Sequence, residues 1–273
     1  MAGGYRMKSI RLLVGIAATV AATSIADAAG GWEQFHGNDG NNGRADKGPD
    51  LRVYGTPRFA APVDGIVADY YMGLNASGPV VSDGRVFCYG GGDIDAYWND
   101  VGPGYLIAFD ESTGMRLWTK QIEHGSYSSS SSPSVSKGRV YVPSGGAVYC
   151  IDAATGGEVW TSALNDAVVN AAVTVAEDLG LCYIHTWGSP TRLHALCIAD
   201  GSPVWTLDMP GRGQGHVAYN AAAGLVYTTI TDASRGRLVA VDAVGGTNVW
   251  TSADSFQNQC SGGIAFDGAR RRP

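Results

Sequence analysis

The sequence predicts an all-β fold built from repeated four-stranded sheets, and composition is the first observation that leads to it. Glycine accounts for 39 of the 273 residues, and only 16% of residues are charged. Runs of Ala, Leu, Glu and Lys, which would favour helices, are scarce after residue 30. This mixture favours many short strands joined by tight turns. With 45% hydrophobic residues the chain is also long and apolar enough to bury a core.

A repeated segment is the second observation. The chain reads AFDESTGMRLW at 108–118, CIDAATGGEVW at 150–160 and AVDAVGGTNVW at 240–250. Laying the chain on itself gives four units, at 77–118, 131–160, 171–205 and 216–250. The Trp residues that end them are 42, 45 and 45 residues apart. A period near 45 that holds four short strands is typical of a β-propeller blade.

Each unit is expected to contain its elements in one order. Strand A ends at an Asp-Gly or Lys-Gly turn, strand B follows, and a variable loop leads to strand C. An Asp-x-x-Thr-Gly turn then joins strand C to strand D, which carries the Trp. Asp110 and Asp152 can accept hydrogen bonds from the amides of this turn, and Gly114 and Gly156 can take a positive φ without strain. The Trp offers a flat face to fill the wedge between sheets. The recurrence therefore predicts architecture and not four copies of an active site.

The repeated unit, A-x-D-x-x-T-G-x-x-x-W, resembles the repeat of the pyrroloquinoline-quinone (PQQ)-type β-propellers. The 108–118 segment matches it in full, and the 150–160 segment matches with Cys150 in the Ala place. In the later units Cys197 and Asp200 stand where Asp and Thr are expected, and Gly245 replaces Thr. The segment GWEQFHGNDGNNGR at 31–44 is similar to the Trp-x-x-Phe-x-Gly opening of such propellers. The resemblance covers residues 31–268 and implies a propeller fold.

The number of units predicts an incomplete ring. Phe59 occupies the strand-D Trp position of an earlier partial unit, and SGGIAFDGA at 261–269 begins a fifth strand A. The resembling family usually closes seven or eight blades. We therefore expect about four complete blades with partial ones on either side, in a domain at 29–273 that is truncated at its C-terminus. A closed ring of four or five blades is the alternative.

The first 28 residues are predicted to be a secretory signal peptide. Three basic residues precede an apolar run of 15, and Ala26-Asp27-Ala28 supplies the small residues that a signal peptidase reads. The run is too short to span a bilayer, and no Cys follows it for lipid attachment. The protein is expected to be exported, to the periplasm or outside the cell. Its net charge of −6 disfavours nucleic acid and anionic membranes as partners.

Five cysteines are an odd number for an oxidising compartment. Four of them lie in strand-like runs, where Cys commonly acts as a small buried hydrophobe. Cys182 and Cys197 flank one candidate hairpin and could pair, so their disulfide status stays open. The sequence has no C-x-x-C, no haem-attachment motif and no adjacent Cys-Cys pair.

Propeller connectivity places the B–C and D–A connections on one face and the Asp-Gly turns on the other. The long segments, at 90–103, 124–132, 185–190 and 210–216, are all B–C or D–A connections. Because functional loops usually project from a rigid scaffold, this face is the expected binding surface. We assign no catalytic, cofactor-binding or metal-binding residue. No G-x-S-x-G elbow is present, and GRGQG lacks the Lys-Thr of a phosphate-binding loop.

Two groups of possible metal ligands are weaker alternatives. The acidic loop at 93–100 brings together oxygen ligands that calcium prefers, but it lacks the Gly and the final Glu of an EF-hand, so a solvated loop is favoured. His185 and His194 lie on either side of one hairpin loop and could share a metal ion, although none of the five histidines has a short metal-binding spacing. The oxygen ligands of the acidic loop are Asp93, Asp95, Asn99 and Asp100.

Two functions remain. The favoured one is a non-catalytic, exported scaffold without a cofactor, which binds a protein or another macromolecule through the loop face. It is similar to the scaffold propellers of the family, among them one that serves outer-membrane β-barrel assembly and is a lipoprotein. The alternative, implied by the same resemblance, is a quinoprotein dehydrogenase that oxidises alcohols or sugars with PQQ and calcium. That class typically has an adjacent Cys-Cys pair against the quinone, which this sequence lacks. Whether the protein is an enzyme is therefore open, and the sequence favours a non-enzymatic role.

Overall fold

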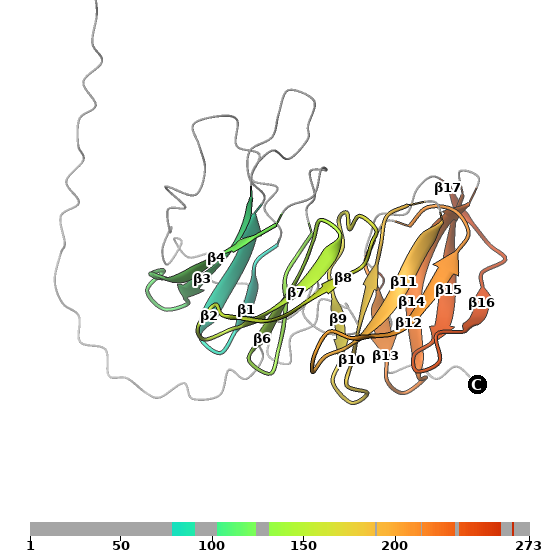
Figure 1. Cartoon of the computed structure of the whole chain (residues 1–273). Coiled ribbons are helices and arrows are strands. Elements are labelled where there is room, and N and C mark those ends of the chain that lie inside the picture. The colour runs from blue at the N-terminus through green and yellow to red at the C-terminus, as the bar shows by residue number, and fades with distance from the viewer. Residues whose placement is uncertain are drawn as a thin grey trace, which may run out of the picture.

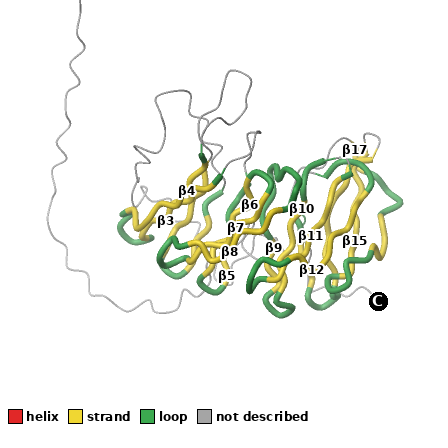
Figure 2. The backbone as a smooth tube through the Cα atoms, viewed as in Figure 1, coloured by secondary structure: helices red, strands yellow, loops and turns green. Residues whose placement is uncertain are grey.

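A computed structural model describes residues 78–90, 103–123, 131–188, 190–213, 215–232, 235–257 and 264. Within these ranges the chain forms strands and loops, as Figure 2 shows, and no helix of these ranges is long and apolar enough to cross a membrane. The expected signal peptide, the partial unit around Phe59, the acidic loop and most of the 261–269 segment lie outside the described residues.

In the described ranges, seventeen strands form four antiparallel sheets, which we call blades I to IV, each in the order A-B-C-D. Blade I (80–122) holds β1 (Val80–Ser82), β2 (Arg85–Gly90), β3 (Gly104–Asp110) and β4 (Arg116–Ile122). Blade II (134–163) holds β5 (Ser134–Ser136), β6 (Arg139–Ser144), β7 (Ala147–Asp152) and β8 (Glu158–Ala163). Blade III (174–209) holds β9 (Thr174–Ala176), β10 (Leu181–His185), β11 (Thr191–Cys197) and β12 (Pro203–Met209). Blade IV (218–257) holds β13 (Ala218–Asn220), β14 (Leu225–Asp232), β15 (Arg235–Asp242) and β16 (Asn248–Thr251), with β17 (Phe256–Gln257) paired to β15.

The blades stand side by side in an open row (Figure 1). Their strands A contact one another in the order β1, β5, β9, β13. Side-chain hydroxyls tie this inner row together, since Ser134 donates to the carbonyl of Val173 and Thr174 donates to that of Val217, both at 2.6 Å. The four predicted blades and the incomplete ring are confirmed. The alternative of a closed four- or five-blade ring is wrong for the described residues, because blades I and IV lie at opposite ends of the row.

The Asp turn between strands C and D has the geometry that its sequence predicts. In blade I, Oδ1 of Asp110 accepts the backbone N–H of Thr113 and the hydroxyls of Ser112 and Thr113, at 2.6–2.8 Å. These bonds, with that from the Ser112 hydroxyl first, lower the pKa of Asp110 to about 2. The degenerate turn of blade III keeps the same shape: the N–H of Gly201 bonds to the carbonyl of Cys197 at 2.9 Å, with φ of 74°.

The Trp of strand D joins each blade to the next. The indole N–H of Trp118 donates to the carbonyl of Ala153 at 3.1 Å, and its ring lies over Gly156 in the same turn of blade II. Trp160 makes the same two contacts with Ile198 and Gly201 of blade III. Trp205 makes them with Ala243 and Gly246 of blade IV. Behind each ring lies an aromatic residue of its own blade, Phe87, Tyr141 or Tyr183, at centroid distances of 5.8–5.9 Å.

The glycine under each indole is required because its φ is positive and because a Cβ would collide with the ring. Substitutions at two glycines can separate these two effects. A Cβ on Gly201 would lie 2.5 Å from Cε3 of Trp160, whereas a Cβ on Gly224 would meet nothing within 4 Å. Both residues have positive φ, so Ala is strained at either position. We expect Gly201→Ala to lower the free energy of unfolding by about 1–3 kcal/mol more than Gly224→Ala, because only the former also displaces a packed ring. Urea unfolding of the two variants measures this difference. Equal losses would mean that the indole does not seat on the turn.

The four described cysteines are free thiols. Cys150 and Cys182 are buried, as expected of strand cysteines, while Cys88 and Cys197 are half-buried. The pairing of Cys182 with Cys197, left open by the sequence, does not form. Cys197 is opposite Leu181 in the β10–β11 ladder, so Cys182 faces the other side of the sheet.

Candidate functional site

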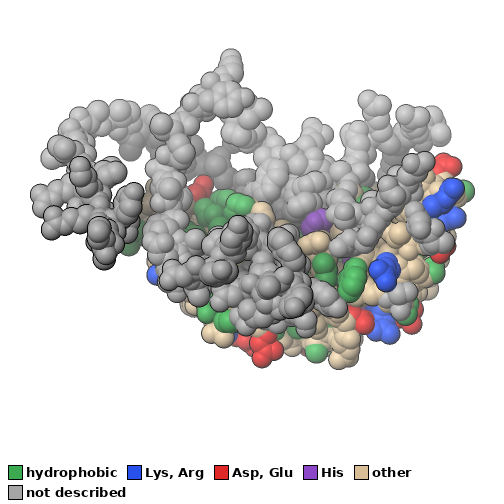
Figure 3. All heavy atoms as spheres, turned by 90° about the horizontal axis from the view of Figure 1, so that it is seen from above, with side chains coloured by type: hydrophobic (Ala, Val, Ile, Leu, Met, Phe, Trp, Pro, Cys, Tyr) green, Lys and Arg blue, Asp and Glu red, His purple; other side chains and the backbone are tan. Residues whose placement is uncertain are grey.

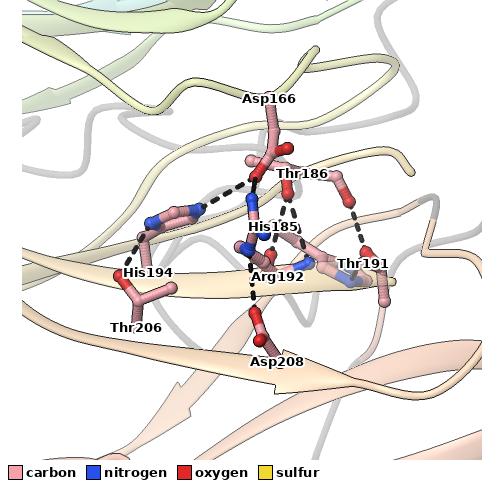
Figure 4. A network of polar contacts seen from close by, with 8 residues as sticks. All are labelled: Asp166, His185, Thr186, Thr191, Arg192, His194, Thr206 and Asp208. Atoms are coloured by element: carbon pink, nitrogen blue, oxygen red, sulfur yellow. Dashed lines mark hydrogen bonds and ion pairs between the residues drawn. The ribbon is translucent and has the colours of Figure 1, made fainter. Parts of the chain in front are cut away.

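A network of polar side chains lies on the face of the B–C and D–A connections, around blade III. Figure 3 looks onto this face from above, where acidic and basic side chains gather towards one end and a histidine reaches the surface nearer the middle. Figure 4 shows the assembly from close by. Its residues come from the β8–β9 connection and from β10, β11, β12 and the loop between β10 and β11.

Arg192, at the start of β11, holds two carboxylates together. Its Nη1 lies 2.6 Å from Oδ2 of Asp166, and its Nε lies 2.7 Å from Oδ1 of Asp208. Both carboxylates raise the pKa of the guanidinium, with the hydrogen bond to Asp208 first. Because the side chain of Arg192 is 34% exposed and that of Asp208 is 66% exposed, these ion pairs are screened and add little to stability. They fix the positions of charged groups at the surface.

His194 lies beneath this ion pair with one nitrogen uncommitted. Its Nδ1 is 3.1 Å from the hydroxyl of Thr206, while its buried Nε2 has no hydrogen-bond partner and stands 4.0 Å from Oδ2 of Asp166. Burial lowers the pKa of His194; Asp166 acts in the opposite direction and Arg192 in the same one. The imidazole is therefore neutral, and Arg192 remains the cation that pairs with Asp166.

His185 is fully enclosed, and both of its nitrogens are bonded. Thr191 donates its hydroxyl hydrogen to the carbonyl of Thr186, so its oxygen accepts from Nε2 of His185 at 2.8 Å. Nδ1 then accepts from the hydroxyl of Thr228 on β14, at 3.1 Å. This arrangement needs the neutral Nε2–H tautomer. Burial, with a smaller effect of His194, lowers the pKa of His185 to about 3. The residue joins blades III and IV.

Gly213, in the connection between β12 and β13, packs against His185. A Cβ on Gly213 would collide with the imidazole of His185 and with Oγ1 of Thr191, so only glycine fits there. The next residue back, Arg212, exchanges backbone hydrogen bonds with Thr231 of β14, at 2.9 and 2.6 Å. The connection is therefore fixed to blade IV, although its composition resembles a flexible linker.

A Trp–Arg pair stands beside the charged group. The guanidinium of exposed Arg212 lies over the ring of half-buried Trp187, 5.8 Å from its centroid. The backbone N–H of Trp187 donates to the carbonyl of Ala167 at 2.8 Å, which places this pair next to Asp166. We call Trp187, Arg192, Asp208 and Arg212 the loop-face patch.

The expected site residues are only partly brought together. The B–C and D–A connections of blade III do share a face. His185 and His194 do not form a joint metal site: His194 is opposite Ile184 in the ladder, so His185 faces the other side of the sheet. Within the described ranges no three His, Cys, Asp or Glu residues are placed to hold a metal ion. The possible calcium ligands at 93–100 lie outside the described residues.

Sequence reasoning missed the loop-face patch. Its members come from two connections and two strands, and none has a motif spacing. Trp187 in HTWGSP and Arg212 in PGRGQGH were a weak signal, because a large aromatic and a cation interrupt loops otherwise made of small residues.

The charged group around Arg192 and His185 offers no free donor to a quinone cofactor. PQQ carries three carboxylates and a quinone, and it would need free cationic and amide donors together with oxygen ligands for calcium. Among the described residues of the charged group, Arg192 is occupied by Asp166 and Asp208, and both nitrogens of His185 are bonded to threonines.

Comparisons with known proteins agree with this fold. The chain matches the profile of the PQQ-like repeat family described as "Outer membrane protein assembly factor BamB", over residues 102–269. It is 30% identical over 172 residues to quinohemoprotein alcohol dehydrogenase ADH IIB of Pseudomonas putida. The aligned region is 58% of this chain and 23% of that protein. Two solved quinohemoprotein alcohol dehydrogenases are similar in fold, ADHIIG of Pseudomonas putida HK5 (TM-score 0.55) and that of Comamonas testosteroni (TM-score 0.56). Each is 17% identical in sequence to this chain. The superposed region is 83% of this chain and 40% of ADHIIG, and 84% of this chain and 42% of the Comamonas enzyme.

The chain is thus a repeat protein of the β-propeller class. It belongs to the PQQ-type β-propeller family, since the profile matches more than half of its length. It spans less than half the length of the dehydrogenases that it resembles.

Proposed function

We propose that this protein is a non-catalytic, exported propeller scaffold that binds a protein partner through the loop-face patch. The observation that carries the proposal is the Trp187–Arg212 pair beside the Arg192–Asp208 ion pair. Trp and Arg are the residue types most enriched in the few positions that dominate protein–protein binding. Here both come from connections that are hydrogen-bonded to the blades, so little ordering is needed on binding.

The charge pattern favours a protein over other partners. The patch presents two arginines and one exposed carboxylate around an aromatic ring, which suits a partner surface of mixed charge. The net charge of −6 opposes binding to nucleic acid. The family profile carries the name of an outer-membrane assembly factor, which is consistent with a scaffold that works beyond the inner membrane. Export itself is proposed from residues 1–28, whose pattern is that of a signal peptide.

The test is site-specific photo-cross-linking in an expressing cell, with the photoreactive residue placed at Pro190, which is exposed in the same loop as Trp187. We expect one dominant cross-linked protein. The substitutions Trp187→Ala and Arg212→Ala together should reduce its yield at least about tenfold, as expected when a binding hot spot is removed. Val244→Ala is the matched control, because Val244 is 62% exposed but lies on the opposite, Asp-turn face. An unchanged cross-link in the double variant would contradict the proposal.

A quinoprotein dehydrogenase is the second candidate, favoured by the 30% identity to a quinohemoprotein alcohol dehydrogenase. Titration with PQQ and calcium, followed by dye reduction with alcohols and aldose sugars, separates the two. We expect no saturable quinone binding and no turnover, because Arg192 is already paired with Asp166 and Asp208. Substrate-dependent turnover with bound quinone would contradict the scaffold proposal and support the dehydrogenase.

A further inference from the structure

The two arginines of the loop-face patch differ in what already contacts their guanidinium groups. Arg192 is bonded to Asp166 through Nη1 and to Asp208 through Nε (Figure 4). Arg212 is exposed, and among the described residues no carboxylate forms an ion pair with it. The contact that its side chain makes within these residues is with the ring of Trp187. The patch therefore presents one cation that is not already bonded to an anion of the described chain.

The contact with Trp187 leaves the hydrogen-bond donors of Arg212 available. The guanidinium carbon lies over the indole, 5.8 Å from the ring centroid, where the attraction acts through the positive charge. The N–H groups of a guanidinium lie in its own plane, where they form a fork that matches the two oxygens of a carboxylate. The contact with the indole engages none of these donors. Arg212 can therefore bind a carboxylate without leaving Trp187.

The backbone at Arg212 is fixed to the blades on both sides. Its N–H and its carbonyl pair with the carbonyl and the N–H of Thr231, at 2.9 and 2.6 Å. A Cβ on Gly211 would collide with the carbonyl of Thr231, and a Cβ on Gly213 would collide with the imidazole of His185. Because both neighbours pack this closely against β14 and β10, the residue between them has little freedom to move. Its side chain therefore projects from a rigid base, which lowers the entropy cost of binding.

The charges near Arg212 favour a single carboxylate over a polyanion. Asp166, Arg192 and Asp208 together carry one net negative charge. Asp208 is exposed and precedes Arg212 by four residues, so the two Cα atoms are at most about 14 Å apart. A doubly charged phosphate, or a run of phosphates, would be repelled by this negative group. A carboxylate carries one charge and is repelled less, so it suits the site better.

We propose that the protein partner of the loop-face patch presents an aspartate or glutamate side chain, whose carboxylate forms a forked ion pair with Arg212 beside Trp187. This inference rests on the proposed function, because it specifies the partner of the same surface. A basic or wholly apolar segment would bury the charge of Arg212 without a counter-charge, which opposes binding. An acidic segment supplies that counter-charge, and Trp187 supplies an apolar face next to it.

The test follows the cross-link from Pro190 in the expressing cell through variants of Arg212. We expect Arg212→Glu to reduce the yield at least about tenfold, because attraction of a carboxylate becomes repulsion. Arg212→Lys should give a smaller loss, since Lys keeps the charge but not the planar fork. Arg116→Glu is the matched control: it changes the net charge equally, but exposed Arg116 follows the Asp turn of blade I. Circular dichroism of each purified variant checks that the blades remain folded.

Charge reversal on both sides completes the test. Mass spectrometry of the cross-linked peptide identifies the partner segment, and its Asp and Glu residues are changed to Lys one at a time. One of these changes should reduce the cross-link to the wild-type protein and raise that to Arg212→Glu at least about tenfold. A partner segment without Asp or Glu, or a cross-link that Trp187→Ala removes but Arg212→Glu leaves unchanged, would overturn the acidic partner and leave the proposed function standing. The absence of any specific cross-link would overturn both.

Discussion

Replacing Trp160 with Ala should lower the free energy of unfolding by about 3–5 kcal/mol, the cost of removing a large aromatic side chain from a complete core. Trp160 is 7% exposed, packs on Tyr141 and on the turn of blade III, and donates its N–H to the carbonyl of Ile198. Its loss would empty the wedge between blades II and III and leave the carbonyl of Ile198 with Arg139 as its remaining side-chain donor. Urea or thermal unfolding followed by circular dichroism measures the effect.

The repeat offers a matched control for this loss. Trp250 has the same aromatic neighbour within its own blade but no next blade among the described residues. Trp250→Ala should cost less than about 1 kcal/mol, in the range of surface substitutions. Similar losses for Trp160→Ala and Trp250→Ala would show that the indole stabilises its own blade and not the junction.

The architecture could be predicted from the sequence because its causes are local. An Asp whose carboxylate caps a turn, a Gly with positive φ and a Trp four residues later are fixed within one stretch such as 110–118, and the period then repeats them. Even the degenerate turn of blade III was placed correctly, since Gly201 keeps the conformation that matters. The failure of Cys182 to pair with Cys197 depends on a register in which Leu181 is opposite Cys197, which the hairpin loop alone does not specify.

The site could not be predicted in the same way because its members are joined only by the fold. Asp166 follows blade II, and Arg192 and Asp208 lie on adjacent strands of blade III. Nothing in their spacing brings two carboxylates to one guanidinium. Likewise, His185 and His194 look like a pair in the sequence. In the β10–β11 ladder, however, His194 is opposite Ile184, so the side chains of His185 and His194 point to opposite faces of the sheet.

The stability of the protein should fall as the pH is lowered from 6.5 to 4.5, and His185 is the main cause. Its pKa in the folded state is lowered to about 3, whereas in the unfolded chain it has the ordinary value of 6.5. Between these values only the unfolded state binds the proton, so the stabilising contribution of neutral His185 is full above pH 6.5 and is lost as the pH falls. One full proton corresponds to about 1.4 kcal/mol per pH unit, and the unfolded imidazole is half protonated at pH 6.5, so the loss over this window is about 2 kcal/mol. His194, whose pKa burial also lowers, adds a change of the same sign.

The measurement is the free energy of unfolding in urea at pH 6.5, 5.5 and 4.5, and the diagnostic quantity is its slope against pH. His185→Gln should reduce that slope by about one proton, because Gln can bond to Thr191 and Thr228 but does not titrate in this window. Thr228→Val is the control: it removes the hydrogen bond to Nδ1 and lowers stability, but it leaves a buried imidazole and hence the slope. The turn carboxylates Asp110, Asp152 and Asp200, whose pKa values are lowered by hydrogen bonds, lose their contributions mainly below pH 4 and so outside the window. A His185 imidazole that titrates near pH 6.5 by NMR in the folded protein would refute the enclosed, neutral histidine and, with it, the close packing of Gly213 against the ring.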